Sequence, residues 1–437
     1  MVRRNSPVIG THWTPSPVRF FFCTEEVIIG TMLDKKVKKI LIFSLAYYPN
    51  FVGGAEVAIK EITDRLSPEE FEFHMITLRF DSKLPRTEKV GNVIVHRIGF
   101  SRPSPTIQDL KKFPLFLNKY WFQFVTPFIA SRLHREYHFD GIWAMMAHSC
   151  GIPAGMFKTL HPEVTYLLTL QEGDPPRYIE RLALPVWPLF KRGFTKADGL
   201  QCISHFLLAW GRRMGFAGHA EVIPNGVDAR HFAHAHTEKE ISSMREKLSK
   251  NPGDIFLVTT SRLVHKNGID DVIRALQLMP DNIQFLVYGI GPSESMLKHL
   301  AKELGLISRV HFKGQLQHPD IPLVFSACDI FIRPSRSEGM GNSFIEAMVA
   351  GLPVIGTQEG GIADFLFDAK RNPDTETTGW AVDKDSPKQI AEAVQDIVAH
   401  PEKAKEVTIT AKKMVQEKYD WTIITKQMQS LFATLGI

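Results

Sequence analysis

From Lys38 almost to its end, the chain alternates short apolar runs with amphipathic stretches, and this alternation restricts the fold more than any other feature. The apolar runs are mostly continuous, which is typical of parallel strands covered on both faces. Between them lie segments with helical periodicity, such as residues 55–66, whose apolar side chains form one stripe. The pattern predicts a doubly wound α/β fold. The strands expected in the first half are residues 40–44, 71–78, 93–98, 141–145, 164–170 and 199–203.

The same alternation restarts after a turn-forming cluster at residues 223–228 and a charged helix that ends near Lys250. The strands expected there are residues 255–260, 283–289, 310–312, 330–332 and 354–355. A chain of 437 residues is also too long for one ordinary core. We therefore predict two Rossmann-like domains, residues 32–220 and 221–418, that face each other across a ligand-binding cleft. Residues 1–31 have no periodic pattern and are interpreted as a disordered leader or a misassigned start.

Charge is distributed unevenly, with 28 basic and 19 acidic side chains in residues 1–220 against 24 and 28 in residues 221–437. The basic half contains a stretch in which lysines and arginines surround aromatic residues. Its members are Lys111, Lys112, Phe113, Phe116, Lys119, Tyr120, Trp121, Phe122, Phe124, Arg132 and Arg135. This stretch is either a core helix with solvated lysines or a surface for anionic lipid headgroups or an anionic acceptor. No nucleic-acid-binding motif accompanies the charge, and the most apolar part, residues 120–130, is shorter than the roughly 20 residues of a membrane span.

Cysteines and histidines do not indicate a metal centre. Cys23, Cys150, Cys202 and Cys328 are far apart and lack metal-ligand spacing, which suits reduced thiols in a cytoplasmic protein. His231, His234 and His236 are close in sequence but have no cysteine or carboxylate beside them. No metal ligand is assigned.

Residues 333–356 carry the strongest local signal for a binding site. A strand is followed by a loop with Gly339 and Gly341, an amphipathic segment and a second strand, which is a βαβ unit. Glu338 and Glu346 lie on either side of the glycine-rich turn, where backbone N–H groups can approach an anion and carboxylates can accept bonds from sugar hydroxyls. The alternative is a capping box, with Ser343 as N-cap and Glu346 reaching back to it.

Two other nucleotide-binding classes lack their signatures. Residues 289–294 miss the third glycine of the dinucleotide-binding motif, and residues 51–56 have no G-x-G spacing. No Walker A sequence is present. These absences disfavour a dehydrogenase and an ATPase.

An ordered set of short motifs resembles the retaining glycosyltransferases of family 4 (glycosyl transferases group 1), which have the GT-B fold. The resemblance covers nearly the whole chain after Met32. Its motifs are residues 53–56 (GGAE), 197–198 (AD) with Ser204, 224–228 (PNGVD), 261–264 (SRLV), 287–292 (VYGIGP), 327–329 (ACD), 334–335 (PS), the Glu338 and Glu346 pair, and 351–355 (GLPVI). The fold it implies has two Rossmann-like domains and a last helix, residues 419–437, that crosses back to the first.

The resemblance also implies roles for individual residues. Negative charge that develops on the leaving phosphate would be stabilised by cations and by backbone donors at a helix N-terminus. The residues implied for catalysis are Arg262, Lys266, Glu338 and His148. Those implied for binding the donor are Gly53, Gly54, Gly339, Met340, Gly341, Asn342, Ser343 and Glu346, with Glu346 on the ribose hydroxyls and Glu338, Gly339 and Met340 on the sugar.

Two positions depart from the family pattern. The family lysine directly precedes the loop glycine, but Asn267 stands there and Lys266 comes one residue earlier. Either Lys266 reaches the phosphate from a shifted loop, or Arg262 alone carries the charge. Gln171 stands where relatives often have histidine.

The implied activity is hexosyl transfer, with retention and without a metal or cofactor, from a UDP-sugar or GDP-mannose to a glycan or lipid-linked acceptor. A role in cell-surface polysaccharide or glycolipid synthesis follows, in the cytoplasm or on the inner face of the membrane. The alternatives are a sugar phosphorylase or nucleotide-sugar epimerase of the same fold, and a catalytically silent binding protein. Product analysis with the donor alone separates them.

Overall fold

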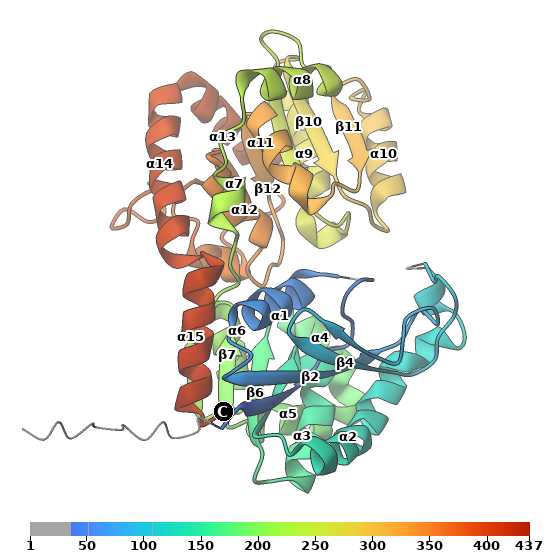
Figure 1. The fold of residues 1–437 in the computed structure, drawn as a ribbon. Coiled ribbons are helices and arrows are strands. Elements are labelled where there is room, and N and C mark those ends of the chain that lie inside the picture. The colour runs from blue at the N-terminus through green and yellow to red at the C-terminus, as the bar shows by residue number, and fades with distance from the viewer. Residues whose placement is uncertain (1–35, 51, 107) are drawn as a thin grey trace, which may run out of the picture. The chain divides into compact units, whose positions relative to one another are not determined.

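The computed structural model describes residues 36–50, 52–106 and 108–437. Its contacts divide the chain into Met1–Lys36 and a compact unit, Val37–Ile437. The interpretation of residues 1–31 as a leader or misassigned start therefore lies outside the described residues. The compact unit contains two sheets, each with its own helices (Figure 1). We call the parts built on these sheets the first and second domains.

The sheet of the first domain has the strand order β3-β4-β2-β1-β5-β6-β7-β8. All neighbouring strands are parallel except β3 and β4, which are antiparallel. At the centre of the sheet, Ile40 of β1 pairs with Phe73 of β2 on one side and with Gly141 of β5 on the other. The strands are β1 (Lys38–Phe43), β2 (Phe71–Leu78), β3 (Thr87–Val90), β4 (Val93–Ile98), β5 (Gly141–Met145), β6 (Thr165–Leu170), β7 (Gly199–Cys202) and β8 (His219–Val222). The α-helices are α1 (Gly54–Arg65), α2 (Asn118–Tyr137), α3 (Ile152–Leu160), α4 (Pro176–Ala183), α5 (Trp187–Thr195) and α6 (His205–Arg213).

The sheet of the second domain is parallel throughout, with the order β11-β10-β9-β12-β13-β14. Its strands are β9 (Ile255–Thr260), β10 (Ile283–Tyr288), β11 (Val310–Gly314), β12 (Ile330–Arg333), β13 (Val354–Gly356) and β14 (Trp380–Ala381). The α-helices from here to the C-terminus are α7 (Ala229–Phe232), α8 (Glu238–Leu248), α9 (Ile269–Ala275), α10 (Glu294–Glu303), α11 (Ile321–Ala327), α12 (Asn342–Ala350), α13 (Pro387–Ala399), α14 (Pro401–Lys418) and α15 (Trp421–Thr434).

Short helical turns connect these elements. They are η1 (Asp109–Lys111), η2 (Leu115–Leu117), the π-helical η3 (Ala147–Gly151), η4 (Leu184–Val186), η5 (His265–Asn267), η6 (Leu276–Leu278), η7 (His318–Asp320) and η8 (Gly360–Asp364). Every strand expected from the sequence is present, with ends that differ by a residue or two, and the doubly wound α/β fold is confirmed. Strands β3, β8 and β14 were not expected. Strand β8 extends the first sheet to Val222. The domain boundaries proposed from the sequence stay predictions.

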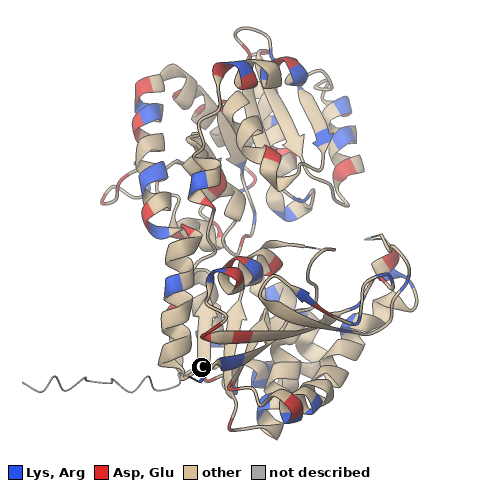
Figure 2. Cartoon of the chain, viewed as in Figure 1, with Lys and Arg blue, Asp and Glu red and all other residues tan. Residues whose placement is uncertain are grey.

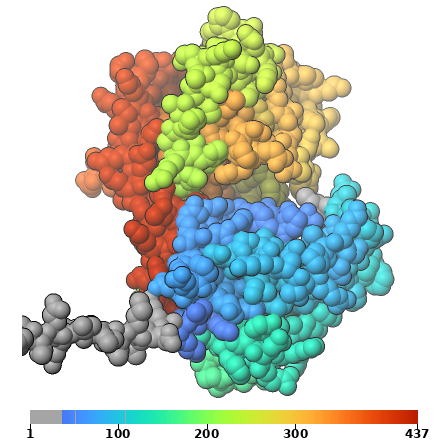
Figure 3. All heavy atoms as spheres, viewed as in Figure 1, coloured from blue at the N-terminus to red at the C-terminus, as the bar shows by residue number. Residues whose placement is uncertain are grey.

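The last helix, α15, packs on the first domain. The Phe432 ring lies 5.5 Å from that of Trp143 and 5.9 Å from that of Phe71. Its buried side chains share a core with β1, β2 and β5, and the red C-terminal segment meets the blue N-terminal one in Figure 3. The chain passes between the domains near Val227 and again near Tyr419. The two crossings lie side by side, since Val227 N–H donates to the Tyr419 carbonyl oxygen at 2.8 Å. The first domain is therefore completed by the last helix of the chain.

Two predictions from the sequence concern the cysteines and membrane spans. Cys150, Cys202 and Cys328 are buried free thiols, while Cys23 lies outside the described residues. Within the described ranges, none of the helices combines the length and apolar character needed to cross a bilayer.

Candidate functional site

The loop between β12 and α12 lies at the carboxyl end of a parallel strand, where α/β sheets bind ligands. The strand ends at Arg333 and the helix begins at Asn342. Gly341 links the loop to the helix with φ of 92°, and a Cβ atom on it would lie 2.6 Å from Nη2 of Arg333. The loop therefore requires glycine at this position.

Arg333 is the buried cation of this loop, and the sequence reasoning did not single it out. Nη2 donates to Oε2 of Glu338 at 2.9 Å, and Nη1 donates to Oγ of Ser343 at 2.8 Å. The guanidinium also stacks over the Phe344 ring at 4.5 Å. Burial lowers the pKa of Arg333, and the charges of Glu338 and Glu346 oppose this shift. Arg333 ends an otherwise apolar strand, but the sequence around it does not show which partner it meets.

Glu338 and Lys266 meet at the edge of the first domain. The second oxygen of Glu338, Oε1, accepts from Gly339 N–H at 3.1 Å. A Cβ atom on Gly173 would lie 3.3 Å from that oxygen and 2.7 Å from Nζ of Lys266. Lys266 itself donates to the Gly173 carbonyl oxygen at 2.6 Å and lies 3.5 Å from Oδ1 of Asp174. An anion bound beside Glu338 would thus compete with a backbone carbonyl for this ammonium group.

Arg262, Lys266 and Asn267 lie in the loop after β9, and their side chains have different surroundings. Asn267 is buried, and its side-chain amide donates to the carbonyl oxygen of Arg262 at 2.7 Å. Lys266 therefore projects towards the first domain, whereas Asn267 holds the loop together. The Arg262 side chain is exposed, and among residues 36–437 that the structure describes its guanidinium has no hydrogen-bonding or ion-pair partner.

The capping-box interpretation of residues 343–346 is wrong. The N-cap of α12 is Gly341, and no side chain caps this helix end. Ser343 bonds to the buried arginine instead, and Oε1 of Glu346 lies 3.5 Å from Nε2 of His318. The bond to Glu346 raises the pKa of His318. The first amides of α12 are left without a side-chain acceptor, which suits an anion.

Gly53 and Gly54 begin α1 in the first domain. Gly53 N–H donates at 2.7 Å to Oε2 of Glu56, a buried carboxyl group whose pKa is raised by that burial. A Cβ atom on Gly54 would lie 4.0 Å from the side-chain nitrogens of both Asn225 and Asn342. The start of α1 and the start of α12 are therefore neighbours.

Three amide side chains meet at this contact. Nδ2 of Asn225 lies 3.3 Å from Oδ1 of Asn342 and 3.4 Å from Oε1 of Gln171. Gln171 thus takes part in the boundary between the domains at the position where relatives often have histidine. Asn225 was part of a sequence motif, but its role in joining the domains was not foreseen.

His148 is in the π-helical turn η3. This turn begins directly after Met146, whose φ is 65°. Its Nδ1 lies 3.5 Å from Oε1 of Glu172, and its Nε2 lies 2.9 Å from Oγ of Ser149. Glu172 is buried, and its Oε2 has no hydrogen-bond partner among the described residues. A Cβ atom on Gly339 would lie 2.4 Å from the Glu172 carbonyl oxygen, so this segment also abuts the glycine-rich loop. The sequence reasoning missed Glu172.

Met340 follows Gly339 in the glycine-rich loop. It is buried and lines a cavity of about 630 Å³ together with Ile203, His205, Asp364 and Tyr419. His205 N–H donates to Oδ2 of Asp364 at 2.8 Å across one wall. Of the predicted site residues, Met340 is the one that lines this cavity.

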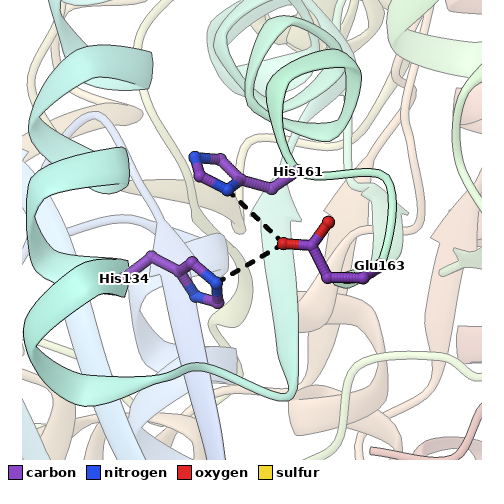
Figure 4. A group of neighbouring side chains, drawn as sticks. All are labelled: His134, His161 and Glu163. Carbon is purple, nitrogen blue, oxygen red and sulfur yellow. Dashed lines mark ion pairs between the residues drawn. The ribbon is translucent and has the colours of Figure 1, made fainter.

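One group of side chains has the spacing of a metal site (Figure 4). Nε2 of His134 and Nδ1 of His161 lie 3.6 and 3.5 Å from Oε1 of Glu163. Phe139 N–H donates to Nδ1 of His134 at 3.1 Å, so neutral His134 carries its proton on Nε2, the atom that would have to bind a metal. The group also precedes β6, at the opposite edge from the strand ends described above. We assign it no metal, and the histidines set aside in the sequence are not part of it: His231, His234 and His236.

Two family models match the chain in succession. Residues 52–231 match "Glycosyltransferase Family 4" and residues 240–414 match "Glycosyl transferases group 1". Together these ranges cover both domains. The chain belongs to the glycosyltransferase family that these two models together describe.

Among curated relatives, a GDP-mannose-dependent phosphatidylinositol monomannoside mannosyltransferase of Corynebacterium glutamicum is 29% identical over 54% of this chain and 62% of its own length. The alignment thus spans less than two thirds of that relative. A 2-deoxystreptamine glucosyltransferase of Streptomyces kanamyceticus is 25% identical over 71% of this chain and 82% of its own length.

Solved structures agree on the fold. Sucrose-phosphate synthase from Thermosynechococcus elongatus has a TM-score of 0.75 and 22% identity, covering 91% of this chain and 99% of that one. Anabaena HepE in complex with UDP-glucose has a TM-score of 0.71 and 19% identity, with coverage of 91% and 99%. The GT-B fold is confirmed, and so is the class of enzyme at the level of the family.

Proposed function

We propose that this glycosyltransferase moves a hexosyl group from a nucleotide diphosphate sugar to a hydroxyl of a glycan or lipid-linked acceptor, with retention of configuration and without a metal. The observation that carries the proposal is the meeting of Lys266 and Glu338 at Gly173, beside a helix N-terminus that no side chain caps. This combination offers a cation and amides to a diphosphate, and a carboxylate to sugar hydroxyls.

In the proposed step the bond between the anomeric carbon and the phosphate oxygen breaks, and its electron pair stays on the phosphate. The acceptor oxygen forms a bond to the same face of the anomeric carbon, and its proton passes to the leaving phosphate. Arg262, Lys266 and the first amides of α12 stabilise the charge that grows on this phosphate. Arg262 has no side-chain partner among the described residues to give up for this purpose.

The two carboxylates have separate tasks in the proposal. Glu346, at the second turn of α12, accepts bonds from the ribose hydroxyls. Glu338 is held by Arg333 at 2.9 Å and accepts from the transferred sugar. His148, held beside the Glu172 carboxylate, positions donor and acceptor.

The choice between donors rests on the relatives' names. Relatives include GDP-mannose-dependent enzymes, and a structural neighbour binds UDP-glucose. We propose a UDP-sugar or GDP-mannose as the donor, and a role in cell-surface polysaccharide or glycolipid synthesis.

A donor-panel screen tests the proposal. The full chain is incubated with UDP-glucose, UDP-N-acetylglucosamine and GDP-mannose, and release of the nucleoside diphosphate is followed with and without excess chelator. Slow release from one donor, insensitive to the chelator and lost in Arg262→Ala, is expected. Release that requires magnesium or manganese would contradict the metal-free step. Isomerised donor without release would indicate an epimerase, release that needs inorganic phosphate a phosphorylase, and binding without turnover a silent protein.

A further inference from the structure

Helix α2 is apolar on two opposite faces. One row of side chains is buried in the first domain, and it consists of Phe122, Thr126 and Ala130. A second row is offset by two residues, and it consists of Tyr120, Phe124 and Phe128. Positions two residues apart lie about 200° apart around a helix, so the second row faces away from the core.

The outward row continues before the helix. Phe116 stands one turn before Tyr120, and the rings of Phe113 and Phe116 lie 6.5 Å apart. Phe113, Phe128 and Tyr120 are 72%, 63% and 57% exposed. We call Phe113, Phe116, Tyr120, Phe124 and Phe128 the α2 aromatic stripe. Exposed aromatic side chains in one row mark an interaction surface, because single exposed apolar residues are ordinary but contiguous ones are not.

Basic residues lie in the same segment as the α2 aromatic stripe, and Figure 2 marks lysines and arginines in blue along the ribbon. They are exposed, and they are Lys111, Lys112, Lys119, Arg132 and Arg135. Lys112 pairs with Asp109 at 3.0 Å, whereas the other four have no carboxylate partner among the described residues. Nζ of Lys119 lies over the Tyr120 ring at 5.0 Å, so cation and aromatic ring already share one surface.

We propose that the α2 aromatic stripe and its basic side chains dock this chain on a membrane surface that bears anionic headgroups. Aromatic rings are enriched at the depth of the headgroups, and a face that combines them with lysine and arginine binds in the plane of the interface. A second copy of the chain fits less well, because a self-complementary contact would bring the basic side chains of two molecules together.

This docking goes beyond the transfer reaction and does not depend on it. The charge supplies attraction to anionic lipid, and the rings supply insertion, so the two contributions can be separated by substitution. The buried row shows that α2 is a core helix on one face, and the proposal assigns docking to the other face.

Vesicle flotation of the full chain tests the proposal, with phosphatidylcholine alone and with phosphatidylcholine plus phosphatidylglycerol. Wild-type chain should partition to the anionic vesicles, and less so at high salt. Lys111→Gln/Lys119→Gln should lower this partition about 25-fold, because each charge is worth about fivefold near such a surface. Phe124→Ser/Phe128→Ser should lower it roughly tenfold or more. The matched controls are Ile409→Ser, also an exposed apolar residue, and Lys388→Gln, both in the second domain, and they should leave partition unchanged.

Several outcomes would overturn the proposal. Wild-type chain that stays unbound on both vesicles, or controls that lose as much binding as the stripe variants, would remove the lipid surface. If light scattering shows dimers that Phe124→Ser/Phe128→Ser dissociates, the stripe is an interface between copies. Circular dichroism confirms that each variant is folded, and Phe113→Ser, in the segment before the helix, repeats the test outside α2. Donor hydrolysis in solution should be unchanged in all of them, so its absence would count against the proposed reaction and not against docking.

Discussion

Replacing Arg333 by methionine removes the cation that holds Glu338 in the candidate site. The Arg333 side chain is 7% exposed and that of Glu338 is 15% exposed. Removing one partner of a buried ion pair costs about 3–5 kcal/mol, because the other charge is left uncompensated. We expect the lower end for Arg333→Met, since Glu338 keeps some contact with water. The loss of the stacking on Phe344 adds to this cost.

The reverse substitution should cost more. Glu338→Gln leaves the arginine charge in a more deeply buried place, so we expect a loss near the upper end of the same range. The double variant Arg333→Met/Glu338→Gln leaves neither charge behind. Its loss should therefore be smaller than the sum of the single losses by about 2 kcal/mol or more.

Urea unfolding of the full chain, followed by circular dichroism, measures the four free energies of this cycle. The matched control is the exposed pair Glu294 and Lys298, whose atoms lie 2.7 Å apart on α10. Its cycle, Lys298→Met with Glu294→Gln, should give a coupling of about 0.3–0.5 kcal/mol. A coupling between Arg333 and Glu338 no larger than the control would refute the claim that burial makes this pair matter.

Four further predictions concern single side chains. Glu346→Ala should weaken donor binding at least about tenfold by calorimetry and leave thermal stability nearly unchanged; the opposite pattern would restore the capping role. Arg262→Ala should lower donor hydrolysis about 100-fold or more, and Lys266→Ala less, because this lysine is shared with a backbone carbonyl; equal losses would contradict that ranking. Asn267→Lys should lower the free energy of unfolding by about 2 kcal/mol, because it buries a charge and leaves the Arg262 carbonyl oxygen without its donor. Tighter nucleotide binding with unchanged stability would instead show that position 267 faces the ligand. Burial lowers the pKa of His96 to about 4, below the roughly 6.5 of an unfolded histidine, so its contribution to stability is present above about pH 6.5 and is lost as the pH falls towards 4. His96→Asn should flatten that loss in urea unfolding at several pH values, and an unchanged slope would contradict the assignment.

Local pattern was enough for most of the strands and for the glycine-rich loop. A parallel strand covered on both faces is continuous and apolar whatever it pairs with, so residues 141–145 could be located without knowledge of their neighbours. Strand β3 was missed because its residues, Thr87–Val90, are polar and half exposed at the edge of the sheet. The short strand β14 has too few residues to show a period.

The candidate site was predicted in part. Lys266 and Glu338 were named from the sequence, and the structure brings them together. Arg333 and Glu172 were missed because nothing in their immediate neighbourhood shows that they are buried beside a partner. Glu172 pairs with His148, which is 24 residues away, and a pattern that spans one loop or one turn carries no information at that distance.

The sequence by itself determined the doubly wound halves, the glycine-rich loop and the family, because these depend on local periodicity and on residues adjacent in the chain. Only the tertiary structure decided that Ser343 bonds to Arg333 instead of capping α12, that Asn267 bonds within its own loop while Lys266 reaches the first domain, and which face of α2 is covered. The physical reason is that burial and hydrogen bonding are settled between segments far apart in sequence. A side chain's role is fixed by the partner that folding brings to it.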